Sequence, residues 1–292
     1  MEKVVKFLAA LTAITLALAF TACDSSDANT DSGNNNGGYT APTLPPSVGT
    51  NPFKGKTFKP LYSDYENCRY VFSDDGETIM YYTYNNEIVP YIQYKYTVNA
   101  DAKTLSWYTE KVDGLSCEEM IEEQLKDYKT ELQEENLSEK EIEERLKQAE
   151  ERVGAIMKLA FSEITTYSYE YNTSKGTLDL VEVFDENQAG FYYNGSSHSD
   201  ISDVNIRMYN SWAYIHRIGS EGFSFEEKSF SKDKKEIVFV NEDDDNDTFP
   251  ATYRLIGSGN NTKLILSFEY SGKQYELTLD FDADEMHLTE AK

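Results

Sequence analysis

The sequence predicts a mainly β protein built of two tandem antiparallel barrels or meanders, with an α-helical hairpin inserted in the first. The hydrophobic fraction is 39%, and the 22 Tyr and 15 Phe favour strands, where aromatic rings pack well on a pleated surface. From residue 53 onward, short runs of Tyr, Val, Ile, Thr and Phe alternate with turn residues about every eight to twelve positions, as in antiparallel sandwiches and barrels. One segment in the middle has helical periodicity instead.

Residues 1–22 have the features of a signal peptide. Lys3 and Lys6 give a positive start, and Phe7–Phe20 is an apolar stretch interrupted only by Thr12 and Thr15. As a helix this stretch would extend about 21 Å, which is short of the roughly 30 Å hydrocarbon core of a bilayer. A cleaved export signal therefore fits better than a permanent membrane anchor.

The leader ends in Phe20-Thr21-Ala22-Cys23, which resembles the lipobox of bacterial lipoproteins. The resemblance implies that Cys23 is lipidated and becomes the mature N-terminus, so a membrane lipid is a partner through the acylated Cys23. An ordinary secretory peptide cut near Ala22 is the alternative. The predicted location is the bacterial cell envelope, outside the cytoplasm, with the outer membrane or cell surface favoured and the leaflet left open.

Residues 23–52 are predicted to form a disordered tether. Their composition is mostly Ser, Asn, Asp, Gly, Thr and Pro, with too few apolar side chains to offset the entropy lost on ordering. The folded part is therefore expected to begin at Phe53.

The strand pattern is clearest in residues 92–98. Ile92, Tyr94, Tyr96 and Val98 alternate with polar residues, so they form one face of a strand and are expected to point into the core. Turn signals separate the other runs, for example at 74–76, 172–176, 257–261 and 271–272.

A weak internal repeat favours a duplicated architecture. The segment from Phe72-Ser73 to Ile79 recurs from Phe230-Ser231 to Ile237. A shorter unit, a Tyr followed eleven residues later by an apolar residue, predicts hairpins of equal length at 94–105, 167–178, 253–264 and 275–286. The predicted domains are 53–188 and 189–292. Two barrels or one larger joined sheet would both satisfy this pattern.

The first copy has a surplus of residues between 105 and 167, and this surplus falls on the helical segment. Ser116 with Glu119 and Ser138 with Glu141 form two capping boxes, which are typical helix starts. Apolar residues then recur every three or four positions in both predicted helices. A helical hairpin is therefore expected at about 113–163.

These features resemble the lipocalin-like β-barrel domains of secreted bacterial lipoproteins, in which a Phe-x-Asp-x-Gly type turn leads to a Tyr-rich strand and then a Leu-x-Leu strand. The matching segments are Phe72–Gly76, Tyr94–Trp107 and Leu178–Leu180. Phe53–Phe58 stands where such domains often open with Gly-x-Trp, and Ser211-Trp212 would open the second copy. The resemblance implies small barrels that bind a ligand or partner without chemistry, on a shape that hosts many functions.

Cys68 and Cys117 remain for the folded part, in a compartment that favours disulfides. Spacing alone does not show whether their Cα atoms come within bonding range. Because Cys68 lies in a predicted strand and Cys117 at a predicted helix start, two separate thiols are expected, with a bridge left open.

Charge and site chemistry argue against several classes of function. Lys and Arg number 27 against 52 Asp and Glu, so nucleic acid is not an expected partner. None of His198, His216 and His287 stands at ligand spacing from another His or a Cys. The acidic run 242–247 fails the EF-hand pattern and is interpreted as a solvated hairpin loop. No catalytic residue, metal site or cofactor is predicted, and the chain is not expected to be an enzyme.

Two features are candidates for binding. Tyr81, Tyr82, Tyr84, Tyr91 and Tyr108 could line a barrel mouth that stacks on sugars or another flat apolar ligand, although cross-strand packing is the favoured interpretation. The helical hairpin could carry a partner of its own. The predicted function is a non-enzymatic binding module for a small apolar ligand or a protein partner. The alternative is a structural or adhesive surface lipoprotein that presents the hairpin and the acidic loop to host or envelope partners.

Overall fold

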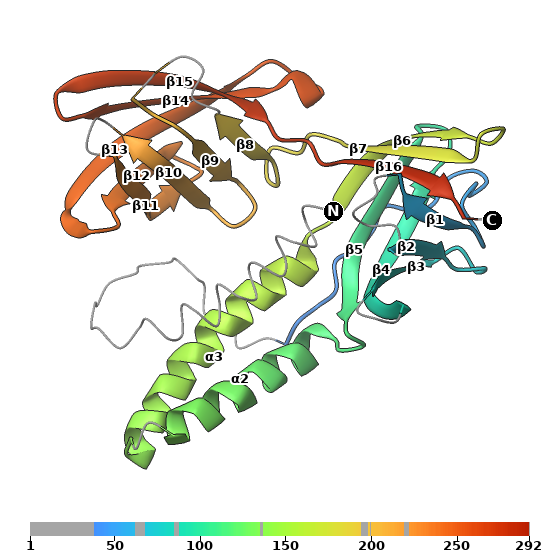
Figure 1. Ribbon diagram of the computed structural model, residues 1–292, viewed down its shortest axis with the longest axis horizontal. Coiled ribbons are helices and arrows are strands. Elements are labelled where there is room, and N and C mark those ends of the chain that lie inside the picture. Colours follow the sequence, from blue (N-terminus) through green and yellow to red (C-terminus); the bar gives the residue numbers. More distant parts are fainter. Residues whose placement is uncertain are drawn as a thin grey trace. The chain divides into compact units, whose positions relative to one another are not determined.

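A computed structural model describes residues 38–61, 68–84, 88–134, 137–193, 198, 200–218 and 222–291. The predicted leader and Cys23 lie outside these residues. Within the described ranges the strands close into two antiparallel barrels of eight strands each, and two helices form a hairpin (Figure 1). The predicted fold, mainly β with two barrels and a helical insertion, is confirmed. The alternative of one larger sheet is excluded.

Barrel 1 is a ring in which each strand from β1 to β6 pairs with the next along the chain. In ring order its strands are β1 (Thr57–Pro60), β2 (Arg69–Phe72), β3 (Thr78–Tyr84), β4 (Ile88–Asn99), β5 (Thr104–Val112), β6 (Thr165–Asn172), β7 (Thr177–Glu182) and β16 (Glu285–Glu290). β16 completes the ring because it pairs with β7 on one side and with β1 on the other.

Barrel 2 is built from the strands between β7 and β16. In ring order they are β8 (Gly190–Tyr193), β9 (Val204–Arg207), β10 (Trp212–Ile218), β11 (Phe223–Ser231), β12 (Glu236–Asn241), β13 (Asp244–Ile256), β14 (Lys263–Tyr270) and β15 (Lys273–Phe281). The ring closes where β15 pairs with β8, with Phe281 opposite Phe191. A short 3-10 turn, η2 (Gly259–Asn261), lies between β13 and β14.

The predicted second domain, 189–292, is wrong at its C-terminal end, because β16 belongs to barrel 1. Two compact units divide the chain, one up to Val181 and again from Asp284, the other from Glu182 to Ala283. Barrel 2 is therefore inserted into the last strand connection of barrel 1. The sequence misleads here because the alternating pattern of β16 marks its inward face but does not identify its neighbours.

Three of the four hairpins predicted from the Tyr-and-apolar repeat are present, at 94–105, 167–178 and 253–264. The Phe-Ser to Ile repeat also matches pairing, since Phe72 pairs with Ile79 between β2 and β3 of barrel 1 and Phe230 pairs with Ile237 between β11 and β12 of barrel 2. The predicted hairpin at 275–286 is wrong, because 275 lies in β15 of barrel 2 and 286 lies in β16 of barrel 1. Trp212 also does not open the second copy, since β8 and β9 precede it in barrel 2.

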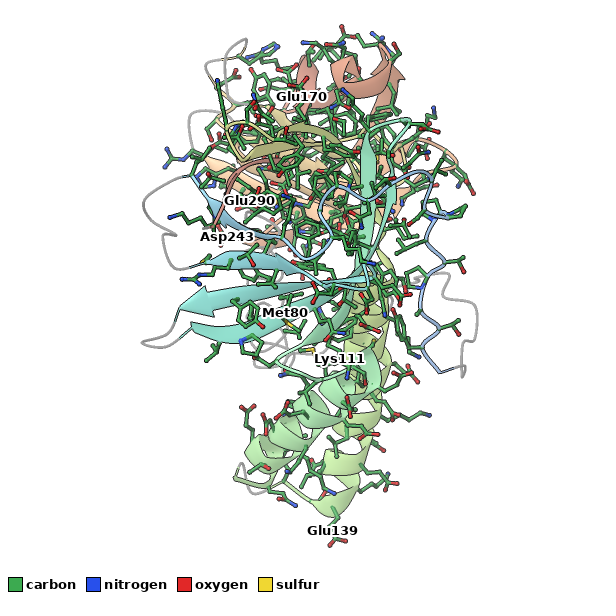
Figure 2. All side chains as sticks on the ribbon, turned by 90° about the vertical axis from the view of Figure 1, so that its right-hand side faces the viewer. Met80, Lys111, Glu139, Glu170, Asp243 and Glu290 are labelled. Carbon is green, nitrogen blue, oxygen red and sulfur yellow. The ribbon has the colours of Figure 1, made fainter. Side chains whose placement is uncertain are left out.

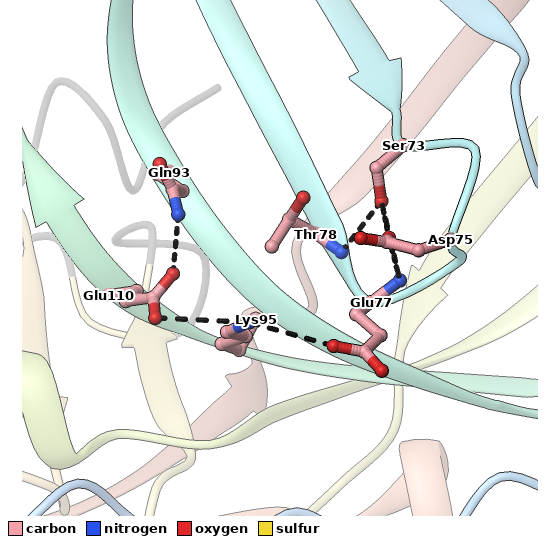
Figure 3. A network of polar contacts seen from close by, with 7 residues as sticks. All are labelled: Ser73, Asp75, Glu77, Thr78, Gln93, Lys95 and Glu110. Atoms are coloured by element: carbon pink, nitrogen blue, oxygen red, sulfur yellow. Dashed lines mark hydrogen bonds and ion pairs between the residues drawn. The ribbon is translucent and has the colours of Figure 1, made fainter.

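The turn between β2 and β3 contains part of the motif that resembles lipocalin-like domains, and side-chain hydrogen bonds close it (Figure 3). The Ser73 hydroxyl donates to the Asp75 carboxylate and accepts from the amide of Thr78 at 3.0 Å. Asp75 accepts from the amide of Glu77 at 2.9 Å. The side chains of Ser73 and Asp75 thus accept hydrogen bonds from backbone amides of the turn, as is common for Ser and Asp in turns.

The helical insertion forms α2 (Cys117–Glu134) and α3 (Glu139–Ser162). The capping box of Ser138 and Glu141 starts α3, with the Glu141 carboxylate accepting from the Ser138 amide at 2.9 Å. The two helices run side by side away from barrel 1, and Glu139 marks the tip of the hairpin (Figures 1 and 2). The hairpin predicted at about 113–163 is therefore present.

The residues that precede β1 contact barrel 1 from position 39 onward. The Tyr39 hydroxyl donates to the carbonyl of Phe161 at 2.9 Å, and Val48 forms a parallel bridge with Asn99. Asn51 donates to the Tyr96 hydroxyl at 2.8 Å. The predicted tether of 23–52 is thus too long at its C-terminal end. Amino-acid composition does not show that single side chains, such as Tyr39 and Asn51, hold this segment in place.

Candidate functional site

The interior of barrel 1 is filled by aromatic rings. Trp107 stacks on Tyr94 with ring centroids 4.9 Å apart and contacts Tyr167 at the same distance. Tyr70 contacts Tyr81 at 4.9 Å, and all five side chains are at most 8% exposed. These rings pack on one another, and Tyr81 is the member of the predicted mouth set that takes part in this cross-strand packing.

The other tyrosines proposed to line a barrel mouth do not share one environment. Tyr82 and Tyr108 are half-buried, and Tyr91 packs against the edge of the barrel 1 core. The side chain of Tyr84 lies outside the described part of the chain. Tyr81 is in the core itself, so the described members do not form one exposed stacking surface.

A buried carboxylate, Asp284, lies within the aromatic interior of barrel 1. It accepts a hydrogen bond from the Tyr167 hydroxyl at 3.1 Å and is 9% exposed. Burial raises the pKa of Tyr70 and Tyr94, and the nearby charge of Asp284 adds to both shifts. These hydroxyls therefore stay protonated at neutral pH, and in the packed interior their role is structural. Sequence reasoning did not identify Asp284, because it stands in a short connection without any local motif.

The helical hairpin has a hydrophobic core of its own. Tyr128, Leu132 and Ala149 are buried between α2 and α3, away from the core of barrel 1. Only the base of the hairpin joins that core, through side chains such as Met120 and Phe161. The outer part of the hairpin is therefore held by its own packing.

The surface of the hairpin is acidic. Exposed carboxylates outnumber exposed cations along both helices. The carboxylates are Glu118, Glu119, Glu122, Glu123, Asp127, Glu131, Glu139, Glu141, Glu143, Glu144, Glu150 and Glu151, and the cations are Lys126, Lys129, Lys140, Lys147 and Arg152. Hydrogen bonds from Ser116 and Ser138 lower the pKa of Glu119 and Glu141, so both capping carboxylates are charged at neutral pH.

A row of aromatic side chains lies on the outer face of barrel 2. Along β10, Ala213 and Ile215 are fully buried, whereas Trp212 and Tyr214 are half-buried and His216 is exposed. Because side chains alternate between the faces of a strand, Trp212, Tyr214 and His216 share the outer face. Sequence reasoning missed this row, since β10 carries apolar residues on both faces.

The acidic run 242–247 forms the turn between β12 and β13 only at 242–243 and continues into β13, so the predicted hairpin loop is shorter than expected. The Asp247 carboxylate accepts from the Asn241 amide group and from the Tyr270 hydroxyl, both at 2.9 Å. The Tyr214 hydroxyl donates to Glu242 at 3.2 Å. These contacts use the acidic side chains to order the turn.

Cys68 and Cys117 are both buried free thiols, so the prediction of two separate thiols is confirmed. Burial raises the pKa of the Cys117 thiol to about 11, so this group stays protonated at neutral pH and is a poor nucleophile. Like other buried free cysteines, the two behave as small apolar side chains.

The described ranges also contain no group of three or more His, Cys, Asp and Glu side chains that could hold a metal ion. No helix among the described residues combines the length and the apolar character needed to cross a bilayer. Comparison with known proteins finds no match to any protein-family model, curated protein or solved structure.

Proposed function

We propose that this chain is a lipid-anchored, extracytoplasmic binding protein that recognises a protein partner through its helical hairpin and carries out no reaction. The lipobox-like segment Phe20–Cys23 and the lipocalin-like motifs support the anchored, exported setting. The observation that carries the proposal is that the hairpin has its own core and an acidic exposed surface, while the barrel that bears it closes without it.

Barrel 1 does not need the hairpin to complete its sheet. β5 and β6, the strands on either side of the insertion, pair directly, with Trp107 opposite Thr165 and Leu105 opposite Tyr167. A short connection between these strands would therefore satisfy the strand pairing, and only the base of the hairpin contributes side chains to the barrel core. The long insertion costs conformational entropy that barrel closure does not require, which favours a role of its own in recognition.

The hairpin is ordered before any partner arrives. Both helix starts are capped, and Tyr128, Leu132 and Ala149 are buried in the hairpin core. Pre-organisation of this kind lowers the entropy lost on binding. The excess of exposed carboxylates favours a partner with a basic surface, because complementary charges speed encounter and exclude acidic competitors.

A ligand inside barrel 1 is less favoured than a partner on the hairpin. The rings around Trp107 already occupy the interior and contact one another at 4.9 Å. An apolar ligand would have to displace this packing, which resembles the close packing of an ordinary core.

A shortened hairpin tests the proposal. Residues 126–150 would be replaced by a Gly-Ser turn, which removes the outer core around Tyr128 and keeps Met120 and Phe161 at the base. With a lysine-reactive crosslinker on native membranes, we expect the intact chain to link one envelope protein through Lys140 or Lys147. The control is a chain with Lys140→Arg and Lys147→Arg, which keeps the hairpin and its charge but removes these crosslinking sites.

The outcomes separate the two classes of function. Co-purification of the same partner with the shortened chain, read without the crosslinker because that chain lacks Lys140 and Lys147, would show that binding does not use the hairpin. Native mass spectrometry of the intact protein would identify a co-purifying small molecule. If such a molecule stayed bound after shortening, a barrel ligand would replace the protein partner in the proposal.

A further inference from the structure

The aromatic row on the outer face of barrel 2 is regularly spaced. The rings of Trp212 and Tyr214 have centroids 6.0 Å apart and planes within 7° of parallel. The ring of His216 follows 6.3 Å from Tyr214, with planes 31° apart. The Arg207 guanidinium lies 5.3 Å from the Trp212 ring centroid and supports it from the neighbouring strand. Three ring systems thus follow one strand on an accessible face.

This row contrasts with the outer surface of β15 in the same barrel. On β15 the outward positions are Gln274, Glu276, Thr278 and Asp280, all exposed and polar or charged. The outer face of barrel 1 near its β2–β3 turn carries charges as well, with Lys95 lying 4.0 Å from Glu77 and 3.9 Å from Glu110 (Figure 3). A local row of two half-buried rings and the exposed ring of His216, bordered by polar side chains, indicates a binding surface.

Polar side chains border the rings on the adjacent strands. Register places Tyr192 of β8, Asn205 of β9, Tyr214 of β10 and Glu226 of β11 in one transverse line on the outer face. Tyr192 is 38% exposed, and its hydroxyl donates to Asp203 at 2.7 Å. The surface therefore combines aromatic faces with amide, carboxylate and hydroxyl groups that can exchange hydrogen bonds with a ligand.

We propose that the outer face of β8–β11 binds a chain of neutral sugar residues. The C–H faces of sugar rings pack on aromatic rings, while sugar hydroxyls donate to carboxylates and accept from amide groups, and this surface offers both kinds of contact side by side. A row of rings along one strand suits an extended oligosaccharide that stacks several sugars in sequence. This site is separate from the hairpin of the proposed function.

The surrounding charge selects a neutral chain. Asp203, Glu226 and Glu242 lie around the rings and outnumber Arg207, which lies over Trp212, and the whole chain carries a net charge of −25. Phosphate-bearing or acidic polymers would be repelled, since recognition of such polymers depends on clustered cations. Neutral hydroxyls instead form hydrogen bonds to carboxylates without a charge penalty.

Tryptophan fluorescence tests sugar binding directly, because the chain has two Trp residues and one of them, Trp212, is in the aromatic row. Trp107→Phe leaves Trp212 as the single reporter. We expect xylohexaose, cellohexaose or mannohexaose to change its emission in a saturable way, and hexagalacturonic acid to have no effect. In that background, Tyr214→Ala and His216→Ala should each weaken binding about tenfold, as expected for the loss of one stacked ring.

Controls separate binding from folding. Ile256→Ala removes an exposed apolar side chain at a position outside the row and should leave affinity unchanged. Trp212→Ala, measured by calorimetry with a folding check by circular dichroism, should abolish binding, whereas Trp212→Phe should retain part of it. The chain with the shortened hairpin should bind the sugar normally. A response to none of the three neutral sugars, a response only to the acidic one, or equal affinity in Tyr214→Ala would overturn the proposal.

Discussion

Lys56, just before β1, and Glu290, at the end of β16, form an ion pair in which the ammonium lies 3.0 and 3.1 Å from the two carboxylate oxygens. The Tyr171 hydroxyl donates to the same carboxylate at 2.7 Å. β16 is also held by its inward side chains, among them Leu288, the register partner of Leu178. The closure of barrel 1 thus depends on a strand that follows the whole of barrel 2 in the sequence.

Leu288→Ala should destabilise barrel 1 selectively. The side chain is 2% exposed, so its truncation leaves a cavity in the barrel 1 core and should cost about 2–5 kcal/mol. Urea unfolding followed by the emission of Trp107, in a Trp212→Phe background, reports on barrel 1 alone. Leu159→Ala is the matched control, because Leu159 is 40% exposed and its loss should cost little. Equal midpoints for the two variants would contradict the inferred role of β16.

Glu290→Gln should remove a pH-dependent part of the stability of barrel 1. Hydrogen bonds from Tyr171 and Lys56 lower the pKa of Glu290, so its contribution is present above the unfolded pKa near 4.5 and is lost as pH falls through the folded pKa. For this partly exposed pair we expect roughly 1 kcal/mol. Thermal melts from pH 7 to pH 3 should show a smaller decline for Glu290→Gln than for the unchanged chain. Identical declines would show that this carboxylate is not coupled to folding.

Cys23→Ala tests the anchored setting. If the lipobox-like segment functions, the exported protein carries acyl chains on Cys23, and mass spectrometry of its N-terminal peptide should show their added mass. The variant should lose that mass and pass from the detergent phase to the aqueous phase in a partition assay. An unmodified Cys23 in the unchanged protein, with that protein recovered in the aqueous phase, would argue for an ordinary secretory leader.

The elements that sequence analysis predicted well have local signals. Phe72 and Ile79 are close in sequence and pair directly across a tight turn, so a repeated motif identifies the hairpin in both barrels. The capping box at Ser138 and the stripe of apolar residues after it likewise fix the start and the buried face of α3. Local propensity and periodicity decide such elements before tertiary contacts form.

The sequence did not predict which distant strands pair, or which side of β10 faces outward. Nothing in the alternation of Met286 and Leu288 distinguishes β1 and β7 from strands of barrel 2 as neighbours, because pairing depends on the whole chain path. In β10, Trp212 and Tyr214 alternate with Ala213 and Ile215, so both faces are apolar and periodicity cannot show which faces outward. The aromatic row therefore emerges only from the fold.

Glu227→Gln should change how the stability of barrel 2 depends on pH. The carboxylate accepts from the amide of Ala213 at 3.0 Å, and burial raises its pKa to about 7. Since the folded state holds this proton more tightly than the unfolded state does, stability is fully present below pH 4.5 and declines as pH rises toward 7. The partly hydrated group should account for about 1–2 kcal/mol after solvent screening. The melting temperature, followed by Trp212 emission, should therefore rise more on Glu227→Gln at pH 8 than at pH 4. An equal rise at both pH values would contradict a raised pKa of Glu227 in the folded state.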